Sequence, residues 1–166
     1  MMRVYIPATV AMLQRLVAEG ALRPVNGTAF AVTPKLREFY ARGDDDELAE
    51  VALGEAALAS LRLLAADDDG AQPLRRAVLS AEVDDADYRP DLDDAVVRLA
   101  GPVALDAVIA AYVDNADAEP AVAAAIEAID AADLGDADAD LIVGDAQDHD
   151  LAWYANQELA FLLELL

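Results

Sequence analysis

The sequence predicts a single α+β domain spanning residues 1–166, in which a mostly antiparallel sheet of four or five strands packs against long helices. A length of 166 residues suits one domain with a sizeable core, and a hydrophobic content of 57% is incompatible with a disordered chain. Segments with strand periodicity and segments with helix periodicity are mixed rather than strictly alternating, and no fixed repeat divides the chain. A ferredoxin-like arrangement is one candidate topology.

Alternation of apolar and polar side chains identifies the strands. It is clearest at 74–83, where Leu79, Ala81 and Val83 fall on one face. The predicted strands are 3–7, 27–32, 74–83, 95–100 and 109–113. Because one such sheet cannot bury both of its faces unaided, we expect the helices to cover it.

Capping residues and the helical spacing of apolar side chains identify the helices. The longest begins at Asp44, where Glu47 completes a capping box, and runs to about Ala66. The other predicted helices are 10–19, 34–42, 104–108, 118–134 and 148–166, and residues 135–140 are predicted to form an acidic linker.

The chain carries 33 acidic against 11 basic side chains, a formal net charge of −22. Nonspecific binding of nucleic acid depends on Lys and Arg releasing counterions, so this chain is expected to repel nucleic acid and anionic membranes. Abundant Asp, Ala, Arg and Gly, with Lys35 as the only lysine, are typical of a GC-rich genome, and adaptation to high salt is an alternative. A further interpretation is mimicry of DNA, with carboxylates at phosphate spacing presented to a basic partner.

The residue types present exclude several classes of site. Without Cys there is no disulfide, thiolate zinc site or iron–sulfur cluster, and a single His excludes two-His metal motifs. No glycine-rich phosphate loop or dinucleotide fingerprint occurs. Asp136, Asp138 and Asp140 resemble the start of a calcium loop, but that loop needs Gly at Leu141 and Glu at Gln147. We therefore expect no metal and no cofactor.

Polar, aromatic and ionisable side chains gather at the predicted start of the last helix. In a helix beginning near residue 148, residues four apart share a face, which groups His149 with Trp153 and Gln157, and Asp150 with Tyr154 and Glu158. Since His titrates near neutral pH, a carboxylate neighbour would orient it as a general base. The catalytic candidates are then His149, Asp150, Tyr154 and Glu158, with Trp153 and Gln157 as binding residues. The alternative is a capping role for His149 and Asp148 and core packing for the two aromatic rings.

A second group of candidates lies on the predicted strands, on the face opposite their apolar side chains. It consists of Arg3, Tyr5, Arg76, Arg98 and Tyr112. If these strands form one sheet, the five side chains form a surface suited to an anionic ligand, a peptide or a second subunit, because Arg binds carboxylates and phosphates in a bidentate manner. The alternative is cross-strand pairing with Glu82 and nearby aspartates, without a binding role.

The two ends of the chain carry further expectations. Residues 161–166 are apolar nearly all round, so they must dock into the core or meet a partner, which makes a homodimer the second option. No signal peptide is predicted at 1–17, which contains Arg3 and Pro7, and the longest apolar run, 121–129, is too short to span a bilayer. A cytoplasmic location is the default expectation.

Three segments resemble an uncharacterised family of short acidic proteins from actinobacteria, classed as a domain of unknown function. They are Arg3–Thr9, Phe30–Pro34 and His149–Ala155. The resemblance extends over nearly the whole chain and fits the GC-rich composition. It implies a lineage, and it implies no activity, catalytic residue or cofactor.

Three hypotheses about function follow. The first is a small cytosolic, non-catalytic interaction or regulatory domain that binds a protein partner or a second copy of itself. The second is a small-ligand-binding protein or acid–base enzyme, which requires His149 to line a concave pocket within hydrogen-bond reach of a carboxylate. The third is an acidic, DNA-mimic-like binder of a basic protein, which requires its carboxylates to form a two-row stripe.

Overall fold

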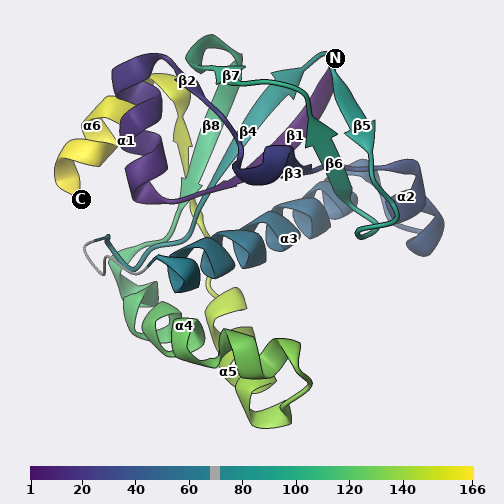
Figure 1. The fold of residues 1–166 in the computed structure, drawn as a ribbon, viewed down its shortest axis with the longest axis vertical. Coiled ribbons are helices and arrows are strands. Elements are labelled where there is room, and N and C mark those ends of the chain that lie inside the picture. The colour runs from purple at the N-terminus through teal and green to yellow at the C-terminus, as the bar shows by residue number, and fades with distance from the viewer. Residues whose placement is uncertain (68–71) are drawn as a thin grey trace.

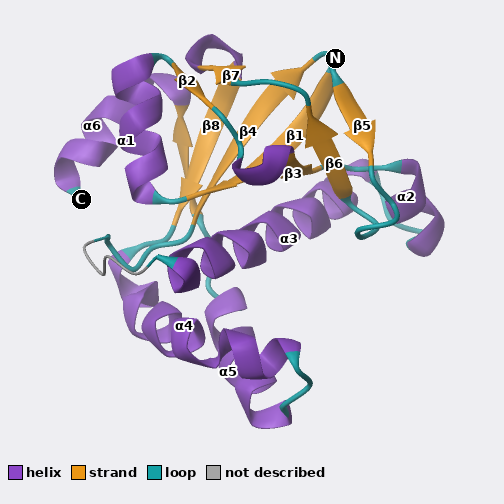
Figure 2. Ribbon diagram, viewed as in Figure 1, coloured by secondary structure: helices purple, strands orange, loops and turns teal. Residues whose placement is uncertain are grey.

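A computed structural model describes residues 1–67 and 72–166 of the chain. Its main sheet consists of β1 (Met2–Ala8), β3 (Thr28–Phe30), β4 (Ala77–Val83), β5 (Ala86–Tyr88), β6 (Val96–Leu99), β8 (Val108–Val113) and β9 (Ala152–Ala155). These strands lie in the order β5-β6-β3-β1-β4-β8-β9, each antiparallel to its neighbours (Figures 1 and 2). A small second sheet pairs β2 (Ala21–Leu22) with β7 (Val103–Ala104). The predicted α+β class is confirmed, although the main sheet has seven strands rather than four or five.

Helices cover both faces of this sheet. They are α1 (Val10–Glu19), α2 (Pro34–Phe39), α3 (Asp45–Ala66), α4 (Glu119–Asp133), α5 (Ala137–Gln147) and α6 (Leu159–Leu165). Helices α1 and α6 pack together on one face, and α3 crosses β1, β3 and β4 on the other. The hairpin formed by α4 and α5 packs on α3 and protrudes away from the sheet (Figure 1). No helix in the described ranges is long and apolar enough to cross a membrane.

The alternation along the strands separates two hydrophobic cores. On β1, Val4 and Ile6 join the core beneath α1 and α6, whereas Tyr5 joins the core beneath α3. On β4, Leu79 joins the core beneath α1 and α6, and Val78 joins the core beneath α3. Since side chains in a strand point alternately to opposite faces, a strand with apolar residues at consecutive positions must be covered on both sides.

Three helix starts agree with the caps expected from the sequence. The side chains of Thr9, Thr33 and Asp44 accept hydrogen bonds from backbone N–H groups three residues on, at 3.3, 3.1 and 2.8 Å. Each bond satisfies a donor that the first turn of a helix leaves free. Asp44 therefore begins α3, which ends at Ala66 as predicted.

The predicted helix at 148–166 and the predicted linker at 135–140 are both wrong. Asp136 caps α5 by accepting a bond from the N–H of Ala139 at 2.9 Å, and α5 ends at Gln147. The following residues pair with β8 as strand β9, and helix begins again only at Leu159. Trp and Tyr favour pleated surfaces, and pairing with β8 decided between the helical and extended conformations of this segment.

The sheet order also decides the topology. Strands β3 and β4 both run antiparallel to β1, on either side of it, so α3 links two parallel strands across a third. This is one split βαβ unit, whereas a ferredoxin-like fold interlocks two. The described chain has one such helical crossover, and the ferredoxin-like arrangement is not formed.

Gly27 provides a test of this packing. Its φ is +69°, and a Cβ atom would lie 2.8 Å from the backbone oxygen of Leu99. We expect Gly27→Ala to lower the free energy of unfolding by about 1–3 kcal/mol, because the left-handed conformation and the close approach both disfavour a side chain. Gly54→Ala is the control: it lies inside α3 with open space around it and should stabilise by about 0.5–1 kcal/mol. Urea denaturation measures both, and equal effects would contradict the packing at Gly27.

Candidate functional site

The residues predicted to share a helix at the C-terminal end lie instead on and around strand β9. Trp153 is opposite Tyr112 of β8 and points to the α3 side of the sheet, where 57% of its surface is exposed. Tyr154 is opposite Ala111 and packs partly into the core beneath α1 and α6. The expected grouping of His149 with Trp153 and Gln157 on one helix face is therefore wrong, because side chains alternate along a strand.

Strand β9 forms one edge of the main sheet, so one side of its backbone pairs with β8 and, among the described residues, no strand pairs with the other side, which is the open edge. The N–H of Ala155 donates to the Glu158 carboxylate at 2.9 Å. This N–H therefore points away from β8 and takes no part in the hydrogen bonds between the two strands. Because backbone groups of alternate residues point to the same edge of a strand, the N–H and C=O of Trp153 face the open edge as well. The edge thus offers a backbone donor and acceptor beside an exposed indole.

His149 and Asp150 lie just before β9, beside a hollow of about 190 Å³ that Glu50 and Leu151 also line. The backbone oxygen of His149 accepts a hydrogen bond from Arg76 at 2.9 Å. Within the described residues, no hydrogen bond joins the His149 imidazole to a carboxylate. Glu158 is occupied as a cap, and Gln157 is exposed in the short 3-10 helix that follows β9. These positions do not support an acid–base pair.

The sequence predicts Arg76 on an open face of the sheet. In the structure Arg76 lies just before β4 and is only 1% exposed. Its guanidinium forms a bidentate pair with the buried carboxylate of Asp114, at 2.9 Å from Nε and 2.7 Å from Nη2. Nη1 donates to the side-chain oxygen of Gln147 at 2.9 Å, and the Gln147 amide donates to the backbone oxygen of Gly54 at 3.1 Å. Each side-chain nitrogen therefore has an internal acceptor, and the charge of Arg76 is paired with Asp114 rather than presented to an anionic ligand.

The remaining members of the predicted Arg/Tyr surface share one face of the sheet, but helix α3 covers its middle. Tyr5 is buried there, with its ring centroid 6.5 Å from that of Tyr112. Arg3 forms an ion pair with Glu82 on the neighbouring strand, at 2.9 Å, which is the cross-strand pairing considered as the alternative. Arg98 lies four strands away from Tyr112, about 19 Å at ordinary strand spacing. The expectation of one open surface is wrong, and a binding role for any single member stays a prediction.

Burial also affects the chemistry of this face. Desolvation raises the pKa of Tyr5, and the neighbouring Tyr112 raises it further. Tyr5 consequently keeps its proton at neutral pH. Nε of Arg98 is buried and has no hydrogen-bond partner among the described residues, and Arg98 does not line the hollow beside His149 and Asp150. Neither residue has the surroundings of a catalytic group.

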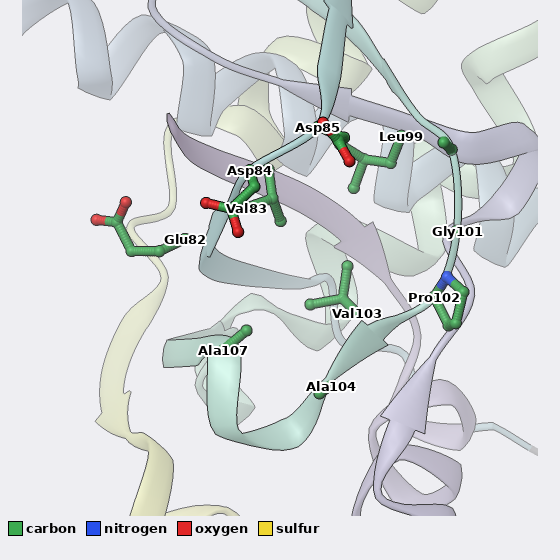
Figure 3. A pocket seen from close by; sticks show the side chains of 11 residues that line it. Glu82, Val83, Asp84, Asp85, Leu99, Gly101, Pro102, Val103, Ala104 and Ala107 are labelled. Carbon is green, nitrogen blue, oxygen red and sulfur yellow. The ribbon is translucent and has the colours of Figure 1, made fainter. Parts of the chain in front are cut away.

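A hollow of about 430 Å³ lies at one end of the sheet, between the β4–β5 turn and the segment that joins β6 to β7. Figure 3 shows Val83, Leu99 and Val103 on its apolar side and the carboxylates of Asp84 and Asp85 nearby. Both aspartates are exposed, and no described Lys or Arg lines the hollow. Its described lining offers the carboxylates of Glu82, Asp84 and Asp85 without a Ser, Thr, Cys or His beside them, and this set does not single out one reaction.

Charge is distributed unevenly along the chain. All 11 Lys and Arg residues lie at or before Arg98, whereas residues 99–166 carry 15 Asp and Glu. Three arginines reach this C-terminal part through ion pairs, Arg62 with Asp133, Arg75 with Glu119 and Arg76 with Asp114. The segment that forms α4, α5, β9 and α6 is accordingly acidic without basic residues of its own.

Carboxylates also occur at the start of α3 and in the loop between β5 and β6. They are thus spread over helices and loops on both sides of the sheet. This distribution gives no support to a two-row stripe that would mimic DNA.

Comparison with models of protein families matches residues 2–163 to a family of unknown function (DUF6912). The chain belongs to this family. The expected membership of an uncharacterised domain family is confirmed, while the actinobacterial lineage stays a prediction. No curated protein and no solved structure matches the chain. Membership of DUF6912 brings no assigned activity, so the case for function rests on the geometry of this chain.

The buried ion pair gives a prediction about stability. Arg76→Met leaves the Asp114 carboxylate buried without its partner, and we expect a loss of about 3–5 kcal/mol in the free energy of unfolding. Adding Asp114→Asn should recover part of this loss, because no unpaired charge is then buried. The exposed pair of Arg89 and Asp91 is the control, where Arg89→Met should cost less than about 1 kcal/mol. Similar losses for the two single variants, measured in urea, would refute the central role of Arg76.

The orientation of the β9 backbone gives a second prediction, because Pro is tolerated only where its missing N–H is not needed for the ladder. Trp153→Pro should be within about 0.5 kcal/mol of Trp153→Ala in unfolding free energy. Tyr154→Pro should be less stable than Tyr154→Ala by about 1–2 kcal/mol, because the Tyr154 N–H faces β8. The Ala variant at each position measures the stability lost with the aromatic ring, so the difference between the Pro and Ala variants reports on the backbone. The reverse ranking would show that Trp153 faces β8.

Proposed function

We propose that this chain is a non-catalytic protein-interaction domain whose partner adds a strand to the open edge of β9. The observation that carries the proposal is the pairing of a free backbone edge with the exposed indole of Trp153. Strand addition takes its affinity from main-chain hydrogen bonds and its specificity from side chains beside them. Trp is also the residue type that most often dominates the energy of protein interfaces.

The surroundings of β9 support this use of the edge. Exposed, flat edges are a hazard, and proteins protect them by charges, bulges or covering elements. Here Glu158 covers the N–H of Ala155 at one end, while no hydrogen bond from the described residues reaches the two outward backbone groups of Trp153. Helix α6 buries Leu159 and Leu162 but leaves Phe161 and Leu165 exposed on its outer side. The C-terminal segment therefore docks into the core and still presents apolar surface close in sequence to the edge.

The rejected geometry of an acid–base site adds to the case for binding rather than catalysis. Of the catalytic candidates, His149 and Asp150 lie beside one hollow, whereas Tyr154 is directed into the core and Glu158 is engaged as a cap. A regulatory role in the cytoplasm stays a prediction.

Affinity capture with edge variants tests the proposal. Wild-type chain and Trp153→Pro are used as baits in an extract of the cells that encode the protein, and captured proteins are identified by mass spectrometry. Phe39→Ala is the matched control, because Phe39 is an exposed aromatic residue on α2, at the other end of the molecule in Figure 1. We expect proteins captured by wild type and Phe39→Ala to be lost with Trp153→Pro. Capture that is insensitive to the Trp153 variant would overturn the assignment to β9.

A further inference from the structure

We infer that the segment received by β9 is a basic, extended stretch of another polypeptide, an inference that rests on the proposed function and specifies its partner. Exposed carboxylates flank the strand on both sides: Asp148 and Asp150 precede it and Glu158 follows it. No Lys or Arg occurs after Arg98 in the sequence, so none lies on β9, on its neighbour β8, or on the helices connected to them.

The arginines that form ion pairs with this region are already engaged by other acceptors. Arg75 is paired with Glu119 at 3.1 Å, and Arg76 is enclosed by Asp114, Gln147 and the backbone oxygen of His149. Within the described residues, Asp148 and Asp150 form no ion pair. An incoming strand with Lys or Arg side chains would therefore meet uncompensated negative charge, which favours oppositely charged cross-strand neighbours.

Trp153 adds a more specific preference for cations. A guanidinium or ammonium group stacked on an indole face is attracted by the ring quadrupole. The exposed indole stands on the α3 side of the sheet, next to the backbone groups that would bind the new strand. A basic side chain opposite Trp153 on that strand would lie against the ring while its backbone pairs with β9. Alternation then places every second residue of the partner on the same side.

A second copy of this chain fits the same edge less well. Antiparallel pairing of two β9 strands would bring the Asp150 end of one strand against the Glu158 end of the other. Like charges that face each other across strands are destabilising, and each copy adds a net charge of −22 to the assembly. The charge around the edge thus selects a basic partner over self-association.

Trp153 is the only tryptophan in the chain, so its fluorescence reports directly on the edge. The probe is a capped heptapeptide that alternates Arg with Val, compared with the same peptide carrying Glu for Arg. We expect a saturable change in emission with the Arg peptide, weakened by added salt, and none with the Glu peptide. N-methylation of alternate backbone nitrogens in the Arg peptide keeps its charge, and it should weaken binding by about tenfold if strand pairing is required.

Variants that remove carboxylates test whether the negative charge beside β9 is what binds the Arg peptide. Asp148→Asn with Asp150→Asn should weaken binding of the Arg peptide, whereas the matched control Asp138→Asn with Asp140→Asn, on α5, should leave it unchanged. Equal effects of the two pairs, equal affinity for the N-methylated peptide, or no binding of the Arg peptide would each overturn the inference.

The experiments distinguish a failure of this inference from a failure of the proposed function. Loss of captured proteins with Trp153→Pro, together with no binding of the Arg peptide, would keep the edge as an interaction site and reject basic chemistry. A concentration-dependent dimer of the wild-type chain that Trp153→Pro abolishes, measured by analytical ultracentrifugation, would assign the edge to a second copy and overturn the inference.

Discussion

The buried pair of Arg76 and Asp114 joins parts of the chain that are far apart in sequence. A guanidinium and a carboxylate removed from water are tolerated only when their hydrogen bonds are satisfied, and here each nitrogen of Arg76 has an internal acceptor. Through these bonds the start of β4 is held to the end of β8, to Gln147 at the end of α5, and to the backbone of His149. The pair therefore positions the point from which β9 begins.

That position has consequences for binding. Strand β9 follows a helical hairpin rather than a tight turn, so its place at the edge of the sheet depends on tertiary contacts before and after it. Before it, Arg76 holds His149, and after it the Asn156 amide donates to the backbone oxygens of Leu105 and Val108 at 2.7 and 2.6 Å. The strand is thus fixed at both ends while its outer side stays open. A rigid, preorganised edge lowers the entropy lost when a partner strand pairs with it.

Local sequence patterns predicted much of the fold and little of the candidate site. The caps at Thr9, Thr33 and Asp44 and the alternation at 77–83 appear in the structure where the sequence places them, because each depends on neighbours within one turn or one pleat. Strands β5 and β9 were not predicted. Both are short edge strands, and they take their conformation from β6 and β8 rather than from their own periodicity. Trp153 was predicted as a binding residue from its place on the face of a helix that does not form, and the reason for its exposure appeared only with the sheet order.

The amino-acid sequence by itself determined the α+β class, the positions of α1, α3 and α4, the absence of thiolate chemistry and the acidic C-terminal segment, since these follow from composition and short-range periodicity. Only the tertiary structure decided that Arg76 is enclosed, that α3 covers Tyr5, and that residues 152–155 form an open edge. Such outcomes depend on contacts between residues tens of positions apart. The alternation of apolar and polar residues along a strand is the same whether a helix or solvent covers a given face. The pattern alone therefore does not tell which side chains become buried.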